Sequence, residues 1–401
     1  MPKKPTTVVA TPTGLGNKLK GVKIDQKRTK PLWDGPCDEG PMGGVTQSML
    51  SRFIVCRYRF GLRVIEGLAP TDTFNKNMEY GNMWHMCEEM FANAGNPIVD
   101  NPNGTPWEKA LLKYAQELAK KYPFQQEEIS KWYNVCKIQF PIYIMYWKRH
   151  RDVVDRTPVF QEQVFNVPYE LPSGRVVRLR GKFDSVDLIG KGKSAGIYLQ
   201  ENKTKSEVDE QQINRQLKFD LQTMMYLIAL KKGLYQGYFC STSIGGCSGD
   251  EIKGVRYNCI RRPLSGGKGS IVRHKAKGKT PEESLESYYG RLKDIIEESP
   301  QDFFMRLKVE ISNRDIELFE EQFLKPCLEQ LCDWYDDQKV RVTGDSWHTQ
   351  PLRAWDYTNY RCPFGIYNVL AEGGCTDVDE YLASGNEVGL TRETTLFREL
   401  N

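Results

Sequence analysis

The sequence GKFDSVDLIGKGKSAGIYLQENK, residues 181–203, contains two segments typical of β-strands, and the run GKGKS between them is typical of a tight turn. Side chains alternate along a strand, so Glu201 and Lys203 are expected to point to the same face of the second strand. A hairpin of the two strands would bring Asp184, on the first strand, alongside Glu201. The sequence therefore predicts a hairpin that gathers two acids and a lysine at one place.

The segments around this hairpin predict an α/β core over residues 157–263. An alternating strand, PVFQEQVFNVPYELPSG, precedes the hairpin, and a long helical run over residues 208–234 follows it. Two further strands are expected over residues 235–242 and 253–263. This order of strands, helix and strands is typical of a mixed sheet with helices packed against it.

The rest of the chain divides into four regions of different composition. Residues 1–45 are rich in Lys, Thr, Pro and Gly and predict a disordered basic tail. Apolar residues at helical spacing predict a helical region over residues 46–156, which carries a histidine motif described below. A basic loop over residues 264–280 leads to a mainly helical extension over residues 281–401.

The composition is that of an ordinary soluble protein, with 39% apolar and 27% charged residues among 401. No apolar run predicts a transmembrane helix or a signal peptide, so we expect a cytoplasmic location. Eleven irregularly spaced cysteines predict free thiols in a reducing compartment. The net charge of +4 comprises +7 over residues 1–31 and −3 over the remainder, which suits either a polyanionic partner or a solvated tail.

Asp184, Glu201 and Lys203 suit the chemistry of phosphodiester hydrolysis. Two carboxylates offer the hard oxygen ligands that Mg²⁺ prefers, and the lysine can stabilise phosphate charge or orient an attacking water. Asp184 lies in an otherwise apolar segment, where burying a carboxylate is costly unless it is paired or binds a metal. The alternatives are a solvated strand face and a structural ion pair between Asp184 and Lys203.

Two helical segments add polar residues that suit such a site. In EYGNMWHMCEEMF, residues 79–91, His85 could supply an imidazole ligand, which would allow Mn²⁺ as well as Mg²⁺. In the helical run after the hairpin, Arg215, Gln222 and Tyr226 are spaced to share one face that could position a phosphate. The alternatives are a core histidine and a polar face turned to solvent.

Taken in order, the pieces GNMWHMCEE, GKFD, QENK and QTMMY resemble the motifs of the PD-(D/E)XK nuclease superfamily, and within it the RecB-type exonuclease branch with its phage-encoded members. The likeness covers residues 46–263 and includes SMLSRFIVCRYRF before the first motif and YNCIRRP after the last. It implies a restriction-endonuclease-like fold, which is a mixed-sheet core flanked by helices, with an N-terminal helical region and a C-terminal helical extension.

The same resemblance implies a role for each matching residue. Lys203 would be the catalytic lysine, acting with Glu201 and Asp184. Four residues would hold Mg²⁺ or Mn²⁺: His85, Asp184, Glu201 and, through its backbone carbonyl, Asn202. Two residues would shape the site and contact DNA: Gln222 and Tyr226.

Some members of the superfamily also hold an iron–sulfur cluster through one cysteine before the histidine motif and three near the C-terminus. Cys56 matches the first position, and Cys362 and Cys375 fall in the region of the others, with Cys327 and Cys332 further upstream. No C-x-x-C pair completes the set, so the expectation is that these are ordinary small apolar residues rather than cluster ligands.

Residues 252–281 contain nine Lys or Arg, one His and no acid. Arg261, Arg262 and the Gly-rich loop after them are expected to neutralise DNA phosphates, a solvated basic loop being the alternative.

The residues together predict a metal-dependent DNA nuclease, and the resemblance favours an exonuclease. Alternatives are a structure-specific endonuclease, a non-catalytic nucleic-acid-binding protein on a nuclease-like fold, and a structural protein whose acids and Lys203 form ordinary ion pairs. The expected partner is DNA and not a membrane. A protein of recombination or replication is a further candidate partner, not identified by the sequence.

Overall fold

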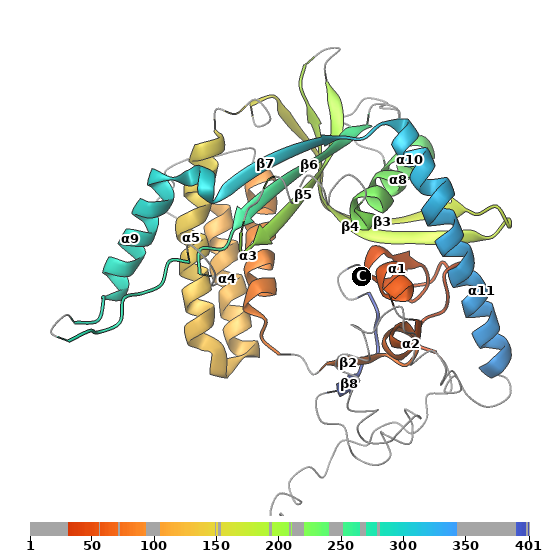
Figure 1. Ribbon diagram of the computed structural model, residues 1–401, viewed down its shortest axis with the longest axis horizontal. Helices are drawn as coiled ribbons and strands as arrows, with labels where there is room; N and C mark the ends of the chain where they lie inside the picture. Colours follow the sequence, from red (N-terminus) through yellow and green to blue (C-terminus); the bar gives the residue numbers. More distant parts are fainter. Residues whose placement is uncertain are drawn as a thin grey trace, which may run out of the picture.

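The computed structural model describes residues 31–55, 57–70, 73–93, 105–148, 150, 154–191, 195–207, 210, 220–239, 252–264, 270–278, 281–342, 390–397 and 400. Its centre is a six-stranded mixed sheet in the order β1-β4-β5-β6-β7, with β3 paired to β4 (Figure 1). The strands are β1 (Val45–Thr46), β3 (Arg156–Glu170), β4 (Val176–Ile189), β5 (Gly196–Lys205), β6 (Ile252–Arg261) and β7 (Phe304–Glu310). The expected restriction-endonuclease-like α/β fold is confirmed.

Strand β4 organises the sheet because three other strands pair with it. β3 runs antiparallel along nearly its whole length, from Glu170 opposite Val176 to Arg156 opposite Ile189. The other edge of β4 is shared: β5 pairs with it antiparallel only as far as Ser185, and the short β1 pairs with it in parallel at residues 179–180. No described strand pairs with this edge between residues 181 and 184, and Asp184 lies in that interval.

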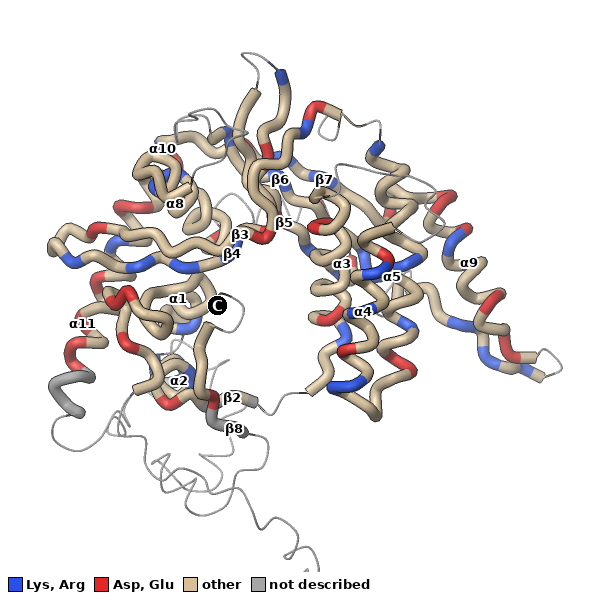
Figure 2. Tube along the Cα trace, turned by 180° about the vertical axis from the view of Figure 1, so that it is seen from behind, with Lys and Arg blue, Asp and Glu red and all other residues tan. Residues whose placement is uncertain are grey.

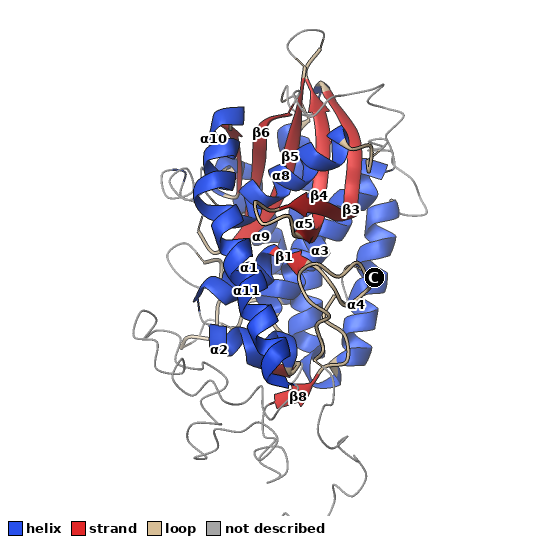
Figure 3. Cartoon of the chain, turned by 90° about the vertical axis from the view of Figure 1, so that its right-hand side faces the viewer, coloured by secondary structure: helices blue, strands red, loops and turns tan. Residues whose placement is uncertain are grey.

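Helices cover both faces of the sheet and form two separate hydrophobic cores (Figure 3). One core lies under α8 (Leu221–Tyr235), which is apolar nearly all round because it is enclosed between the sheet and other helices. The helical segments packed around this core are α1 (Gln47–Val55), α2 (Arg57–Phe60), the π-helical η1 (Gly61–Ile65), α10 (Asn313–Phe319), the π-helical η7 (Glu320–Leu324) and α11 (Lys325–Val342).

The second core joins the other end of the sheet to a helical bundle, seen at the left of Figure 1. Its buried centre contains Trp84, Trp132 and Phe140, which are all less than 2% exposed. The bundle helices are α3 (Lys76–Asn93), α4 (Pro106–Lys121), α5 (Gln126–Trp147) and α9 (Leu285–Glu298), with the short 3₁₀ turns η2 (Pro123–Gln125) and η6 (Pro300–Asp302). A two-stranded antiparallel ribbon of β2 (Leu68–Pro70) and β8 (Leu390–Arg392) lies apart from the main sheet.

Two local predictions need correction. The helical run expected over residues 208–234 is interrupted at Asp220, which has an extended backbone (φ −62°, ψ 129°) and caps α8 by accepting a hydrogen bond from the Thr223 amide. The strand expected from residue 235 is a turn and loop over residues 236–239, and residues 240–251 lie outside the described part.

Among the described helices, none combines the length and the apolar character needed to cross a membrane.

Candidate active site

The candidate site forms where β5 leaves β4. The pairing of the two strands ends at Ser185 opposite Gln200, so beyond Gln200 the backbone of β5 no longer pairs with the backbone of β4. The amide of Asn202 instead donates a hydrogen bond of 2.9 Å to the Asp184 Oδ2 carboxylate oxygen. The divergence of the strands therefore opens room for side chains while Asp184 still ties the two strands together.

Glu201 and Lys203 point to the same side of β5, as their spacing predicts. Lys203 Nζ lies 2.7 Å from Glu201 Oε2, and the Gln222 side chain bonds to both, at 3.1 Å to Lys203 Nζ and 3.2 Å to Glu201 Oε2. Gln222 is in the first turn of α8, which the Asp220 cap places beside β5. The three side chains form a closed hydrogen-bonded triangle that fixes the direction of the lysine.

The carboxyl group of Glu201 is fully buried, and its Oε1 atom has no hydrogen-bond partner among the described residues. Burial raises the pKa of Glu201, although the neighbouring Lys203 opposes the shift. An unsatisfied buried carboxylate oxygen is costly unless a further ligand completes its bonding. This oxygen therefore fits a divalent cation.

His85, Glu162 and Asp184 form a second group of potential ligands close by. His85 Nδ1 lies 3.5 Å from Glu162 Oε1 and 3.5 Å from Asp184 Oδ2, and one ligand atom from each of the three residues lies within 4.8 Å of the others. Burial alone would lower the pKa of His85, but the carboxylates of Asp184 and Glu162 raise it to about 9. Two carboxylates and an imidazole are a donor set that suits Mg²⁺ or Mn²⁺.

Glu162 is the residue of this site that sequence reasoning missed. It lies in β3 between Gln161, paired with Ser185, and Gln163, paired with Phe183, and so stands opposite Asp184. Its backbone has φ +48°, the one positive value of a non-glycine residue among those described, which is a strained conformation for a side chain of this kind. Nothing in the run QEQVF sets this glutamate apart, so only the cross-strand geometry identifies it.

Tyr226, one turn after Gln222 on α8, lies against the aromatic rings of Phe165 and Phe183, at centroid distances of 5.3 and 5.8 Å. A Cβ atom on Gly181 would lie 3.1 Å from the Tyr226 ring and 2.5 Å from the Phe165 ring, so glycine is required there for the close approach.

Arg215, which was expected on the same helical face as Gln222 and Tyr226, lies outside the described residues. α8 begins after the extended Asp220 and carries Gln222 and Tyr226.

A pocket of about 540 Å³ lies beside the candidate site. One part of its lining consists of site residues: His85, Asp184, Lys203, Gln222 and Tyr226. The opposite walls come from α1, from η1 and from residues near the C-terminus that include Glu393 and Phe397. Segments far apart in the sequence thus enclose the catalytic candidates.

Arg261 and Arg262, at the end of β6, make contacts within the protein. The Arg261 guanidinium lies over the Phe303 ring at 5.1 Å, and Arg262 Nη1 donates to the Thr204 carbonyl at 2.6 Å.

The basic run that follows Arg262 contains no acid in the sequence, but acids of the next segment lie close to it in the structure. Glu282 pairs with Arg273, and Glu283 accepts a hydrogen bond from the His274 amide. Figure 2 shows both acidic and basic positions along the neighbouring α9. Lys275 and Lys277 are the exposed cations of this run in the described part.

The three residues considered as cluster ligands, Cys56, Cys362 and Cys375, lie outside the described residues. Cys327 and Cys332 lie on α11 as free thiols, and Cys332 is close enough to Cys37 for a thiol–thiol hydrogen bond that, together with burial, raises the Cys332 pKa.

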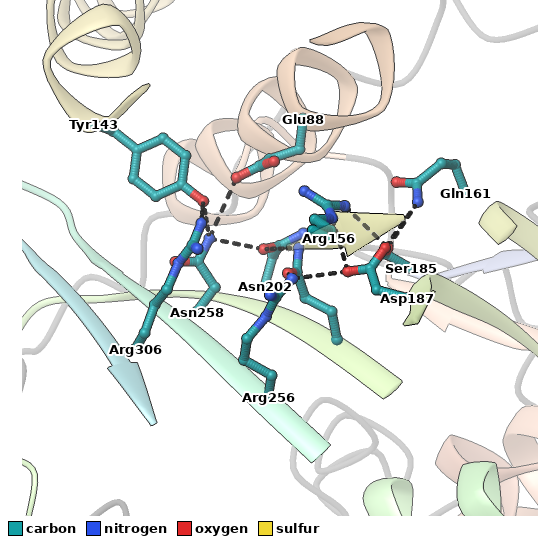
Figure 4. Close-up of polar contacts among 11 residues, drawn as sticks. Glu88, Tyr143, Arg156, Gln161, Ser185, Asp187, Asn202, Arg256, Asn258 and Arg306 are labelled. Carbon is teal, nitrogen blue, oxygen red and sulfur yellow. Dashed lines mark hydrogen bonds and ion pairs between the residues drawn. The ribbon is translucent and has the colours of Figure 1, made fainter. Parts of the chain in front are cut away.

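Behind the site, a buried polar network fills the space between the sheet and the α3–α5 bundle (Figure 4). Asp187 is its central acid, 2.7 Å from Arg256 Nη2 and 2.9 Å from Arg156 Nε. Asn258 joins three elements, since its Nδ2 lies 2.9 Å from Asn202 Oδ1 on β5, 3.3 Å from Glu88 on α3 and 2.7 Å from Tyr143 on α5. The network therefore links the helix that carries His85 to the strand that carries Glu201 and Lys203.

Comparison with known proteins assigns the chain to a family. The model of the PD-(D/E)XK nuclease superfamily matches residues 45–324, which is well over half of the chain and includes His85, Glu162, Asp184, Glu201 and Lys203. The protein therefore belongs to the PD-(D/E)XK nuclease superfamily, whose members are nucleases that use divalent metals. No curated protein matches the sequence.

Proposed function

We propose that this protein is a metal-dependent DNA exonuclease of the RecB-type branch, in which Asp184, Glu201 and Lys203 carry the hydrolysis. The observation that supports this most directly is the separation of β4 and β5, beyond which Asp184, Lys203 and His85 line one pocket, with Glu201 hydrogen-bonded to Lys203 and Glu162 grouped with His85 and Asp184. The exonuclease assignment rests on the order of the motifs and their likeness to that branch.

The residues of the site have two kinds of proposed role, namely metal binding and positioning of the water and the DNA. His85, Glu162, Asp184, the free Oε1 of Glu201 and the Asn202 carbonyl are the candidate ligands for Mg²⁺ or Mn²⁺. A bound divalent ion would supply Lewis-acid stabilisation of the phosphate and a lowered pKa for an attacking water. Lys203, held by Glu201 and Gln222, would orient that water and stabilise the negative charge that develops on the phosphate. Tyr226 would line the path of the DNA strand.

Cleavage assays on defined DNA test the proposal. Purified protein is incubated with linear and closed circular DNA, single- and double-stranded, in Mg²⁺, Mn²⁺ or EDTA. We expect metal-dependent degradation of linear DNA, with closed circular DNA left intact. Cleavage of the circles would instead indicate an endonuclease, and absence of any cleavage would contradict the proposal.

Site variants assign the activity to the proposed residues. Asp184→Ala and Lys203→Ala are expected to lower the cleavage rate by about 10²-fold or more, the usual size of the loss of one charge-stabilising group. Lys205→Ala is the matched control, because Lys205 is an exposed lysine on the same strand. If the two site variants cleave as fast as this control, the assignment fails and a non-catalytic DNA-binding role becomes the better explanation.

A further inference from the structure

The pocket has a wall that comes from the far end of the sequence. Residues 390–397, here called the C-terminal strap, begin with β8, which pairs with β2. The strap is held further by the Glu393 amide, which donates to the Gly67 carbonyl at 2.7 Å, and by Phe397, whose ring lies 4.4 Å from the Arg180 guanidinium. Glu393, Thr395, Leu396 and Phe397 of the strap line the pocket that holds Asp184 and Lys203.

Glu393 forms an ion pair with Arg63 inside this pocket. Arg63 belongs to the π-helical segment η1, and short π-helical segments are frequent at functional sites because they displace side chains from regular helical positions. The two side chains are 24% and 18% exposed, so solvent and a ligand in the pocket can both reach them.

The Arg63–Glu393 ion pair differs from the ion pairs made by the two lysines that line the pocket, Lys182 and Lys203. Lys182 is paired with Glu162 and Lys203 with Glu201, and both of these acids belong to the candidate metal site. Glu393 lies on a different segment and is not in the group of potential metal ligands. Its carboxylate therefore neutralises an arginine of the pocket without contributing to the candidate metal site.

A guanidinium binds carboxylate and phosphate through the same planar pair of N–H groups. A DNA strand with its scissile phosphate at Asp184 and Lys203 would bring neighbouring phosphates against the pocket walls. Partly exposed ion pairs contribute little net stability, so a phosphate can replace the carboxylate at low cost.

Building on the proposed function, we propose that Arg63 binds a phosphate of the DNA strand, and that Glu393 occupies Arg63 as a carboxylate substitute when DNA is absent. The strap thus lowers the affinity of the pocket for DNA until a phosphate displaces Glu393. The structural alternative is that the Arg63–Glu393 pair only fastens the strap.

DNA binding in EDTA separates the two explanations. The probe is a short fluorescein-labelled single-stranded oligonucleotide, followed by anisotropy at several salt concentrations. Glu393→Gln should lower its Kd about two- to fivefold, which is the size expected when one partly exposed ion pair no longer competes. The slope of log K against log salt should stay close to the wild-type value, because Arg63 contacts a phosphate in both proteins, whereas Arg63→Gln should make it shallower by about 0.7, the value for one lost phosphate contact. Arg63→Gln should raise Kd, and the double variant should match Arg63→Gln alone.

Glu317→Gln is the matched control, because it releases Arg314 from an exposed ion pair on α10, outside the pocket. Its Kd should equal that of the wild type.

Arg63→Lys keeps the positive charge and should retain more affinity for DNA than Arg63→Gln. This comparison tests the role of Arg63 even if Glu393→Gln does not fold. An unchanged or weakened affinity in folded Glu393→Gln, or a double variant that still gains affinity over Arg63→Gln, would overturn the inference while leaving the nuclease proposal intact. If the wild type binds no DNA in EDTA, the inference fails, whereas the nuclease proposal is decided by the cleavage assays in Mg²⁺ or Mn²⁺.

Discussion

The backbone amide of Asn202 donates to the carboxylate of Asp184 across the point where β4 and β5 separate. This bond replaces the strand pairing that ends at Ser185 and Gln200. It sets the distance between the acid of one strand and the Glu201–Lys203 pair of the next. The geometry of the candidate site thus depends on the point at which two neighbouring strands of the sheet stop pairing.

Glu162 should affect metal binding as strongly as the residues recognised from the sequence. We expect Glu162→Gln to weaken Mn²⁺ affinity by about tenfold or more, because it removes one carboxylate from a three-residue group. Isothermal titration calorimetry with Mn²⁺ measures the change. Glu170→Gln, an exposed acid at the end of the same strand, is the control. Equal affinities for the two variants would remove Glu162 from the candidate ligands.

The metal-free protein should lose stability as pH rises through the range in which His85 loses its proton. The pKa of His85 is raised from 6.5 to about 9 in the folded state, so the protonated ring stabilises the fold fully below pH 6.5. That contribution declines between pH 6.5 and about 9. Urea unfolding in EDTA over this range should show a declining free energy of unfolding. His85→Gln should flatten the decline, and a variant that retains the full wild-type slope would show that another group is responsible.

Gln222 should matter for the rate of cleavage more than for DNA binding. Gln222→Leu removes the hydrogen bonds to Lys203 and Glu201 while keeping a similar volume, so Lys203 loses its fixed direction. We expect kcat to fall about 10- to 100-fold, as for other residues that orient catalytic groups, with KM little changed. Gln236→Leu, at the exposed C-terminal end of α8, is the control. A rise in KM with an unchanged kcat would contradict a positioning role.

Asp187 should be important for stability. Asp187→Asn leaves Arg256 and Arg156 buried without their ionic partner, and such a loss costs about 3 kcal/mol. Chemical denaturation gives the free energy of unfolding. Lys113→Ala, which removes an exposed ion pair to Glu117 on α4, should cost less than about 0.5 kcal/mol. A similar small value for Asp187→Asn would mean that the network relaxes around the change.

The sequence predicted the elements that local patterns encode. The hairpin of β4 and β5 and the strand β6 lie where alternation and turn residues place them, and α3, α4 and α9 lie within the regions that are predicted to be helical. The shared direction of Glu201 and Lys203 follows from the two-residue period of a strand, and the structure shows it as a 2.7 Å contact.

Features that arise from non-local contacts could not be predicted in this way. Glu162 becomes a candidate ligand only because the register of β3 places it opposite Asp184. The cap at Asp220 was overlooked because the apolar spacing continues past it, and a capping aspartate is hard to distinguish from a helical one without the backbone. The role of the strap depends on a contact between residues 63 and 393, which no local pattern reports.

The strap also has a consequence for how the protein is made. His85, Asp184 and Lys203 leave the ribosome long before residues 390–397, and synthesis proceeds at about 5–20 residues per second. During this interval the nascent chain has its catalytic candidates but lacks one wall of the pocket and the acid that pairs with Arg63. The pocket is complete only when translation has reached the strap, so a nascent chain that ends before residue 390 has an open pocket and an Arg63 without Glu393.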